Sequence, residues 1–414
     1  MSAKGSVFPE RDSAIHRPMY HGGKRLGQMA RIFVLVDALG WAYLKDRDFL
    51  PEILTFRTEV QTVLGFSSGA IPALLSGMPP RESGHWNLFY YDPENSPFRW
   101  IRPLCWLPAP MLNSRVIRRV VRFVSQRVSQ FGGYFQIYGV PVELLPFFDI
   151  CEKADIYRPG GVPGSIFDSL QESGIPFRSY SYHQMPDRDI IVQACRDFKK
   201  YHVDFYFIYL SQMDEFLHHW CADEQRVEEK IREYERWLRK LYAEAQQAFG
   251  DVDFVVCSDH GMTPKHAGYD LLAEINSLGL KVPDEYIGLY DSTMARFWCF
   301  TDRARKRIQK KLEALESGRV LDRRDQERYG IDFSDNRFGD VIFLMNPGVV
   351  IEPSFMGRRG PAGMHGFDPE QDPCSAAAFL ANRNPGRPVK TLIDVHAVML
   401  DWIDSMRGAV RVQS

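Results

Sequence analysis

The stretch Phe254-Val255-Val256-Cys257-Ser258-Asp259-His260-Gly261-Met262 decides the fold class of this chain. Its first four residues are apolar, as expected of a short strand that is buried on both faces of a sheet. The polar loop that follows carries a carboxylate and an imidazole. In an open α/β sheet, ligands bind at the carboxyl ends of the strands. The stretch therefore predicts both a buried strand and a functional site at its end.

Two other apolar runs have the same layout. Residues 32–36 are followed by Asp37, and residues 205–210 lead into a segment that contains Asp214 and His218. The carboxyl ends of parallel strands meet at one edge of a sheet, so we expect these side chains to gather with Asp259 and His260.

Helical patterns separate the strands. Residues 227–245 and 392–406 each place apolar side chains on one helical face. A further apolar run, residues 341–345, is expected to add a strand to the same sheet. This alternation predicts an α/β fold with a mainly parallel central sheet.

The residue types at the strand ends predict a metal site. Clustered carboxylates without a cation would repel one another and be driven towards protonation. Asp and His are ligands that zinc accepts when it keeps an open coordination position. Asp214 and His218 are four residues apart, so a helix would place both on one face. An exposed Asp–His pair on a helix surface is the alternative explanation of that spacing.

Small residues precede a short helical pattern that ends at Gly77. A turn at a helix N-terminus suits an anion such as phosphate, because free N–H groups point outward there. Ser67 and Ser68 lie at this point. Either serine is a candidate nucleophile activated by a metal, or merely the cap of the helix.

Taken together, these motifs resemble the alkaline phosphatase superfamily, in particular its type I phosphodiesterase/nucleotide pyrophosphatase branch. The resemblance covers residues 31–406. It implies a three-layer sandwich around a mainly parallel sheet, with a cap formed by insertions. The matching elements are Val36-Asp37, Ser67 ahead of Ser76-Gly77, Asp214 with His218, Ser258-Asp259-His260-Gly261-Met262, and Met364-His365-Gly366-Phe367-Asp368-Pro369.

The resemblance also implies a centre of two divalent metal ions, usually zinc, with manganese as another choice. Six side chains would supply the ligands. They are Asp214, His218 and His365 for one ion, and Asp37, Asp259 and His260 for the other.

The family places its nucleophile ten residues before the glycine that ends the short helix, which selects Ser67 and leaves Ser68 as the fallback. In nucleotide pyrophosphatases, an Asn three residues after the nucleophile contacts the phosphoryl oxygen. Ala70 stands at that position here. Asn87 and Lys265, together with His266, are the candidates for binding substrate in its place.

The implied activity is that of a metal-dependent phosphoric ester hydrolase, of phosphodiesterase or pyrophosphatase type, which forms a phospho-seryl intermediate. A phosphomonoesterase is the alternative, as is a mutase or phosphotransferase acting on a phosphorylated head group or lipid-like substrate. A binding protein on the same fold would be expected to have lost ligands, whereas all six candidates and a hydroxyl are present.

The composition limits the partners. The 51 Lys and Arg residues face 53 Asp and Glu residues, so binding of nucleic acid through bulk charge is not expected. A small-molecule phosphate ester is the expected partner. We expect a polar tail over residues 1–30 and one catalytic domain over residues 31–412, with cap or lid insertions at about 88–150 and 265–340.

One segment does not share this balance of basic and acidic residues. Residues 95–142 contain seven arginines and no Asp, Glu or Lys. A basic amphipathic helix in this segment would suit an anionic membrane, an anionic head group, or packing on the domain with a solvated basic face. Its expected apolar face consists of Ile117, Val121, Val124 and Val128.

The seven cysteines are spread singly, which indicates free thiols in a reducing compartment. Residues 1–30 are polar and lack the apolar core of a signal peptide. We therefore expect a cytoplasmic protein, and peripheral contact with a membrane is compatible with that location.

Overall fold

The computed structural model describes residues 29–128, 131–201 and 203–413. Nearly all of the tail expected over residues 1–30 lies outside these ranges. No helix in the described ranges is both long enough and apolar enough to cross a membrane.

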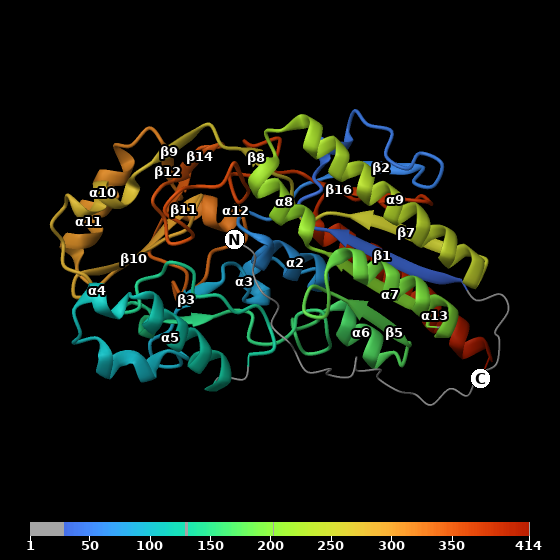
Figure 1. The fold of residues 1–414 in the computed structure, drawn as a ribbon, viewed down its shortest axis with the longest axis horizontal. Helices are drawn as coiled ribbons and strands as arrows, with labels where there is room; N and C mark the ends of the chain where they lie inside the picture. The colour runs from blue at the N-terminus through green and yellow to red at the C-terminus, as the bar shows by residue number, and fades with distance from the viewer. Residues whose placement is uncertain (1–28, 129–130, 202, 414) are drawn as a thin grey trace.

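A six-stranded sheet forms the centre of the fold (Figure 1). Only β16 runs against its neighbours, so the sheet is mainly parallel and the predicted fold class is confirmed. The strand order is β2 (Phe56–Val60), β16 (Ala377–Ala381), β7 (Val252–Cys257), β1 (Ala30–Val36), β6 (Phe205–Leu210) and β5 (Phe177–Tyr180).

Helices cover both faces of this sheet, because alternate side chains of each strand point to opposite faces. In β1, Val34 packs in the core beneath one helical layer, and Phe33 packs in the core beneath the other. The first layer contains α7 (Asp187–Lys200) and α9 (Glu224–Phe249). The second contains α2 (Ser67–Ser76), α6 (Ile166–Glu172) and α13 (Leu392–Gln413). The result is a three-layer sandwich.

A second sheet lies beside the sandwich and is antiparallel throughout (Figure 1). Its strands, in order, are β10 (Tyr286–Tyr290), β11 (Met294–Cys299), β13 (Val341–Met345) and β12 (Gly318–Val320). The strand expected over residues 341–345 therefore exists, but its expected place in the central sheet was wrong. The apolar run predicts burial, and burial is the same in either sheet.

The arginine-rich segment lies between β3 (Phe89–Tyr91) and β4 (Phe148–Ile150), which pair with each other. It contains η1 (Arg99–Leu104), α4 (Ala109–Leu112) and α5 (Arg115–Val128), and η2 (Leu145–Phe147) follows. Its buried residues share one hydrophobic core with the antiparallel sheet.

The remaining elements are short. They are α1 (Trp41–Leu44), α3 (Pro80–Ser83), α8 (Gln212–Trp220), α10 (Leu271–Asn276), α11 (Asp302–Glu313), α12 (Arg323–Arg328), β8 (Thr263–Pro264), β9 (Ala267–Tyr269), β14 (Val349–Ile351) and β15 (Gly363–Met364).

Candidate active site

The carboxyl ends of three neighbouring strands define the site. Asp37 follows β1 directly, and Asp259 with His260 follows β7 after one residue. The third strand, β6, leads into α8, which carries Asp214 in its first turn. The parallel register aligns these strand ends, so the structure brings together the side chains that the sequence placed at this edge.

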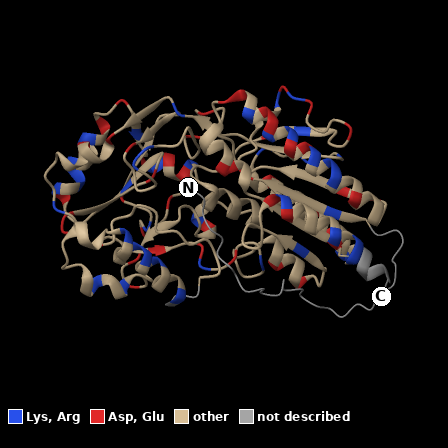
Figure 2. Cartoon of the chain, viewed as in Figure 1, with Lys and Arg blue, Asp and Glu red and all other residues tan. Residues whose placement is uncertain are grey.

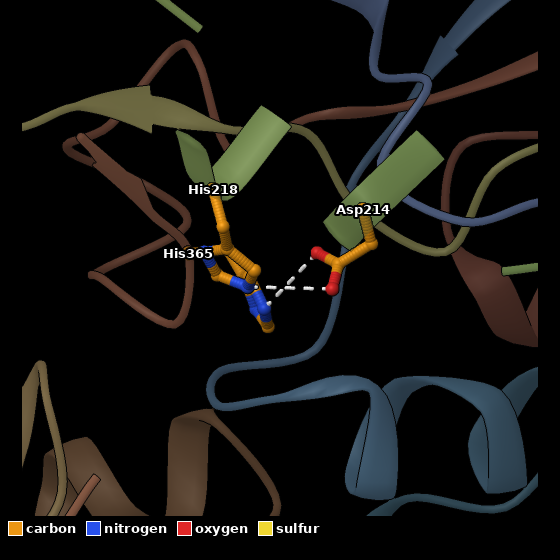
Figure 3. A group of neighbouring side chains, drawn as sticks. All are labelled: Asp214, His218 and His365. Atoms are coloured by element: carbon orange, nitrogen blue, oxygen red, sulfur yellow. Dashed lines mark ion pairs between the residues drawn. The ribbon is translucent and has the colours of Figure 1, made fainter. Parts of the chain in front are cut away.

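The first group of side chains consists of Asp214, His218 and His365 (Figure 3). The Nε2 atom of His218 lies 3.3 Å from one carboxylate oxygen of Asp214, and the Nε2 atom of His365 lies 3.5 Å from the other. The Nδ1 atom of His218 lies 2.9 Å from the carbonyl oxygen of Gly363, which orients Nε2 towards the group. Asp214 and His218 therefore lie on one face of α8, as their spacing predicted, and His365 meets them there.

The second group shares Asp214 with the first. Potential ligand atoms of Asp37, Asp214 and His260 lie within 4.8 Å of one another. The Nε2 atom of His260 is 3.2 Å from Asp259 Oδ2 and 3.4 Å from Asp37 Oδ1. The rings of His260 and His365 stack with their centroids 3.8 Å apart, so the two groups are adjacent.

Three carboxylates of the site have a buried oxygen that accepts no hydrogen bond from a described residue. Burying such an atom without a partner costs free energy. A divalent cation would satisfy all of them, and oxygen and imidazole donors are ligands that zinc or manganese accepts. The donor set therefore fits a metal centre. These oxygens are Asp37 Oδ1, Asp214 Oδ1 and Asp259 Oδ2.

The electrostatics of the site agree with this fit. Burial raises the pKa of Asp37, and the carboxylates of Asp259 and Asp214 raise it further. Burial and the neighbouring His260 hold the pKa of His365 well below its ordinary value, so this imidazole is neutral, as metal ligation requires. Burial opposes ionisation of Asp214, yet the neighbouring His218 imidazole holds the pKa of its carboxyl below the usual range.

The two candidate serines point in different directions. Ser67 is the first residue of α2, and its Oγ atom lies 2.9 Å from Nε2 of His260. Ser68 Oγ donates a hydrogen bond of 3.1 Å to the carbonyl oxygen of Trp86. The N-cap residue of α2 is Phe66, so neither serine is the N-cap of this helix. Ser67 therefore faces the carboxylate and imidazole groups, and Ser68 faces away.

The candidate substrate-binding residues lie in different surroundings. Asn87 is buried, its Oδ1 atom accepts no hydrogen bond from a described residue, and it follows Trp86 beside α2. Lys265 forms an ion pair with Glu352. Within the described ranges, no hydrogen bond or ion pair joins Lys265 or the side chain of His266 to the six candidate ligands.

Sequence reasoning missed three residues that support the site. Tyr209 of β6 donates a hydrogen bond to Asp37 Oδ2. Thr62 Oγ1 donates a 2.6 Å hydrogen bond to the backbone carbonyl of Asp259, and the ring of Phe66 meets His365 edge-on at 5.6 Å between centroids. Tyr209 carried the clearest signal, because a tyrosine inside an otherwise buried strand needs a partner for its hydroxyl.

Comparison with known proteins identifies the family. The family model for type I phosphodiesterase/nucleotide pyrophosphatase matches residues 160–368, just over half of the chain. A comparison with curated protein sequences gave no match.

Solved structures show the same fold. Human ectonucleotide pyrophosphatase/phosphodiesterase 5 is 15% identical, with a TM-score of 0.64 over 91% of this chain and 95% of that one. The murine protein is 17% identical, with a TM-score of 0.63 and the same coverage. An inactive murine variant in complex with AMP is 17% identical, with a TM-score of 0.64 and again the same coverage. The chain therefore belongs to the type I phosphodiesterase/nucleotide pyrophosphatase family of the alkaline phosphatase superfamily, and it is a phosphoric ester hydrolase with two groups of side chains that could hold a metal ion.

Proposed function

We propose that this protein hydrolyses a phosphodiester or pyrophosphate bond in a small-molecule substrate, with Ser67 as the nucleophile. The observation that carries the proposal is the position of the Ser67 hydroxyl, 2.9 Å from His260 at the junction of the two ligand groups. A serine with only a structural role would be expected to bond to the backbone, as Ser68 does to the carbonyl oxygen of Trp86.

In this proposal, two divalent ions, zinc or manganese, occupy the centre. Asp214, His218 and His365 hold one ion, and Asp37, Asp259 and His260 hold the other. The buried carboxylate oxygens without hydrogen-bond partners support this assignment. Such ions lower the pKa of a bound hydroxyl and stabilise charge on the phosphoryl and leaving oxygens.

The covalent step uses Ser67. Its Oγ atom attacks phosphorus and loses its proton to solvent, while the bond between phosphorus and the leaving oxygen breaks. The leaving oxygen keeps the electron pair of the broken bond and takes up a proton from solvent, so the products are phospho-Ser67 and a released alcohol or phosphate. A water molecule then attacks the same phosphorus, the bond to Oγ breaks, and the serine hydroxyl is restored.

Substrate binding is assigned to Asn87. Its side chain is buried next to the Trp86 carbonyl that anchors Ser68, and its Nδ2 atom donates a weak 3.5 Å hydrogen bond to Sδ of Met294, which a phosphoryl oxygen would replace. An amide donor directed at a phosphoryl oxygen would stabilise charge that develops during the transfer. The AMP bound to the murine relative supports a small phosphate ester as the ligand class.

Replacement of Ser67 by alanine tests the proposal. Hydrolysis of bis(p-nitrophenyl) phosphate and of p-nitrophenyl phosphate would be measured, together with the metal content of the purified protein. We expect Ser67→Ala to lower kcat for the diester by at least about 10³-fold, because the nucleophile is lost. Ser68→Ala is the matched control, since it removes a neighbouring hydroxyl that faces Trp86, and it should keep most of the activity.

Three results would overturn the assignment. Turnover that survives both chelation and Ser67→Ala would exclude the mechanism. Loss of activity in Ser68→Ala alone would move the nucleophile to Ser68. A strong preference for the monoester over the diester would favour a phosphomonoesterase instead.

A further inference from the structure

The outward face of α5 exposes a stripe of apolar side chains. Val116 is 68% exposed, Val120 is 50% exposed and Phe123 is 60% exposed. They are four and three residues apart, so they lie on one side of the helix. The opposite side, which includes Val121 and Ser125, is buried against the protein. The exposed stripe is therefore additional to the face that holds the helix in place.

Two further large apolar side chains are exposed in the segment that precedes α5. Trp106 is 80% exposed, and Met111 in α4 is 54% exposed. Trp100 of η1 donates a 3.2 Å hydrogen bond through Nε1 to the Oγ atom of Ser125, which joins the segment before Trp106 to the inner side of α5. The apolar side chains thus belong to one folded unit.

Exposed arginines accompany the apolar stripe, and no acidic residue lies on α5 (Figure 2). None of these arginines forms an ion pair with a residue that the structure describes. Arg118 differs from them, because it donates to the backbone carbonyls of Tyr138 and Val140 and helps to fix the helix. The exposed arginines are Arg115, Arg119, Arg122 and Arg127.

The basic helix α11 offers a comparison within the same protein. Its apolar residues Ala304, Ile308 and Leu312 are all buried. Several of its basic residues are paired, for example Arg305 with Asp340 at 3.2 Å. The helix α11 thus presents charge to solvent without an apolar stripe, whereas α5 presents both.

We propose that the surface formed by Trp106, Met111, Val116, Val120, Phe123 and the four exposed arginines of α5 binds a membrane that contains anionic phospholipids. In this arrangement the helix lies in the plane of the interface. The apolar side chains enter the boundary between head groups and acyl chains. The arginines donate hydrogen bonds to lipid phosphates, and the anionic surface supplies the counter-charge that the protein does not. This membrane surface is separate from the ligand groups of the active site, so the proposal stands independently of the proposed hydrolysis.

Vesicle sedimentation tests the proposal on the full-length protein. Vesicles of phosphatidylcholine alone would be compared with vesicles that also contain phosphatidylserine. We expect sedimentation with the anionic vesicles, weakened by added salt. The double variant Arg115→Gln/Arg119→Gln should lower the partition coefficient about 30-fold, since each basic residue near such a surface contributes about fivefold. Trp106→Ser/Phe123→Ser should lower it by at least about tenfold, through lost apolar burial.

Matched substitutions on other surfaces serve as controls. Arg307→Gln/Lys310→Gln removes two exposed charges from α11, and Ile393→Ser removes an exposed apolar side chain from α13. Both should bind vesicles like the wild type, and every variant should keep the wild-type unfolding temperature.

Equal binding of the wild type to both kinds of vesicle would overturn the proposal. Undiminished binding by both α5 double variants, or an equal loss in the α11 control, would do the same. A dimer that Trp106→Ser/Phe123→Ser converts to a monomer, without vesicle binding, would make the surface an interface between copies of this chain.

Discussion

Tyr209 shows how one hydroxyl supports the site. It stands one residue before the end of β6 and donates its proton to Asp37 Oδ2, which leaves Asp37 Oδ1 without a hydrogen-bond partner among the described residues. The hydrogen bond fixes the orientation of the carboxylate and opposes the rise in its pKa that burial, Asp259 and Asp214 cause. A metal ligand held in this way is pre-oriented.

Replacement of Tyr209 by phenylalanine should weaken metal binding. The ring and its packing are kept, but the hydrogen bond to Asp37 is lost, so we expect the affinity of the centre for zinc to fall by roughly 10- to 100-fold. Competition with a chromophoric chelator would measure this change. Tyr180→Phe is the matched control, because Tyr180 lies on β5 of the same sheet and its hydroxyl donates a 2.8 Å hydrogen bond to Asp197 of α7. Equal loss of affinity in the two variants would contradict a specific role for Tyr209.

The contrast between Asp37 and Tyr209 explains what the sequence could predict at this scale. Asp37 interrupts an apolar run at the place where a parallel sheet binds ligands, so its position alone was informative. Tyr209 lies inside the run, and the pattern indicates only that it is buried. Its partner depends on the register between β1 and β6, which local sequence does not specify.

At the scale of elements, Ser67 is the first residue of α2, and contacts at the C-terminal end of this helix help to fix its position. The helix ends at Gly77, which has a φ of 68° and closes the last turn by donating to Ala73. A Cβ atom at Gly77 would lie 2.5 Å from Cδ2 of the buried His396 on α13. The left-handed backbone and the close approach both require glycine at this position.

We predict that Gly77→Ala destabilises the protein by about 2–4 kcal/mol, from about 1 kcal/mol of left-handed strain and the remainder from overpacking. Gly84→Ala is the matched control. Gly84 ends α3 with a φ of 76°, but no atom of a described residue lies within 4 Å of the added Cβ. It should therefore lose only about 1 kcal/mol. Urea unfolding would measure the free energy of unfolding of both variants. Equal losses would show that contact of the added methyl group with α13 does not destabilise the protein.

The sequence predicts where individual strands lie, but it does not predict which strands pair. The bounds expected for β6 and β13 match the structure, because an uninterrupted apolar run is a strong local signal. The same signal led to the wrong sheet for β13, because a strand that is buried on both faces has the same apolar pattern whichever strands pair with it. The partners of β13 are β11 and β12, and both pairings are antiparallel.

At the scale of the whole molecule, the ligand groups join segments that are far apart in the chain. Asp37 follows β1, Asp214 lies on α8, His260 follows β7, and His365 follows β15. In the proposed assignment one ion would join α8 to the segment after β15, and the other would join the segments after β1 and β7. Neither ion would have a comparable site in the unfolded chain, so binding would stabilise only the folded state.

Metal removal should therefore lower the thermal unfolding temperature. At a free zinc concentration about 1,000 times Kd, the gain is about 4 kcal/mol. For a chain of this length, such a gain corresponds to a shift of about 5 °C, at an unfolding entropy of about 2 cal/mol/K per residue. Scanning calorimetry with EDTA, and then with excess zinc, would measure the loss and its recovery. Asp214→Asn should weaken the response strongly, because Asp214 is a proposed ligand of one ion and its carboxylate also lies within 4.8 Å of the potential ligand atoms of Asp37 and His260.

A second buried aspartate provides the control for that substitution. Asp187 of α7 accepts hydrogen bonds from Tyr234 and from the backbone of Ser211 and Gln212, and it belongs to neither ligand group. Asp187→Asn should be destabilised and still respond to chelation, because it damages the fold and leaves the metal ligands intact. A chelator response in Asp214→Asn as large as that of the wild type would show that the stabilising ion binds elsewhere. A wild-type unfolding temperature that does not change on chelation would show that no bound ion stabilises the folded protein.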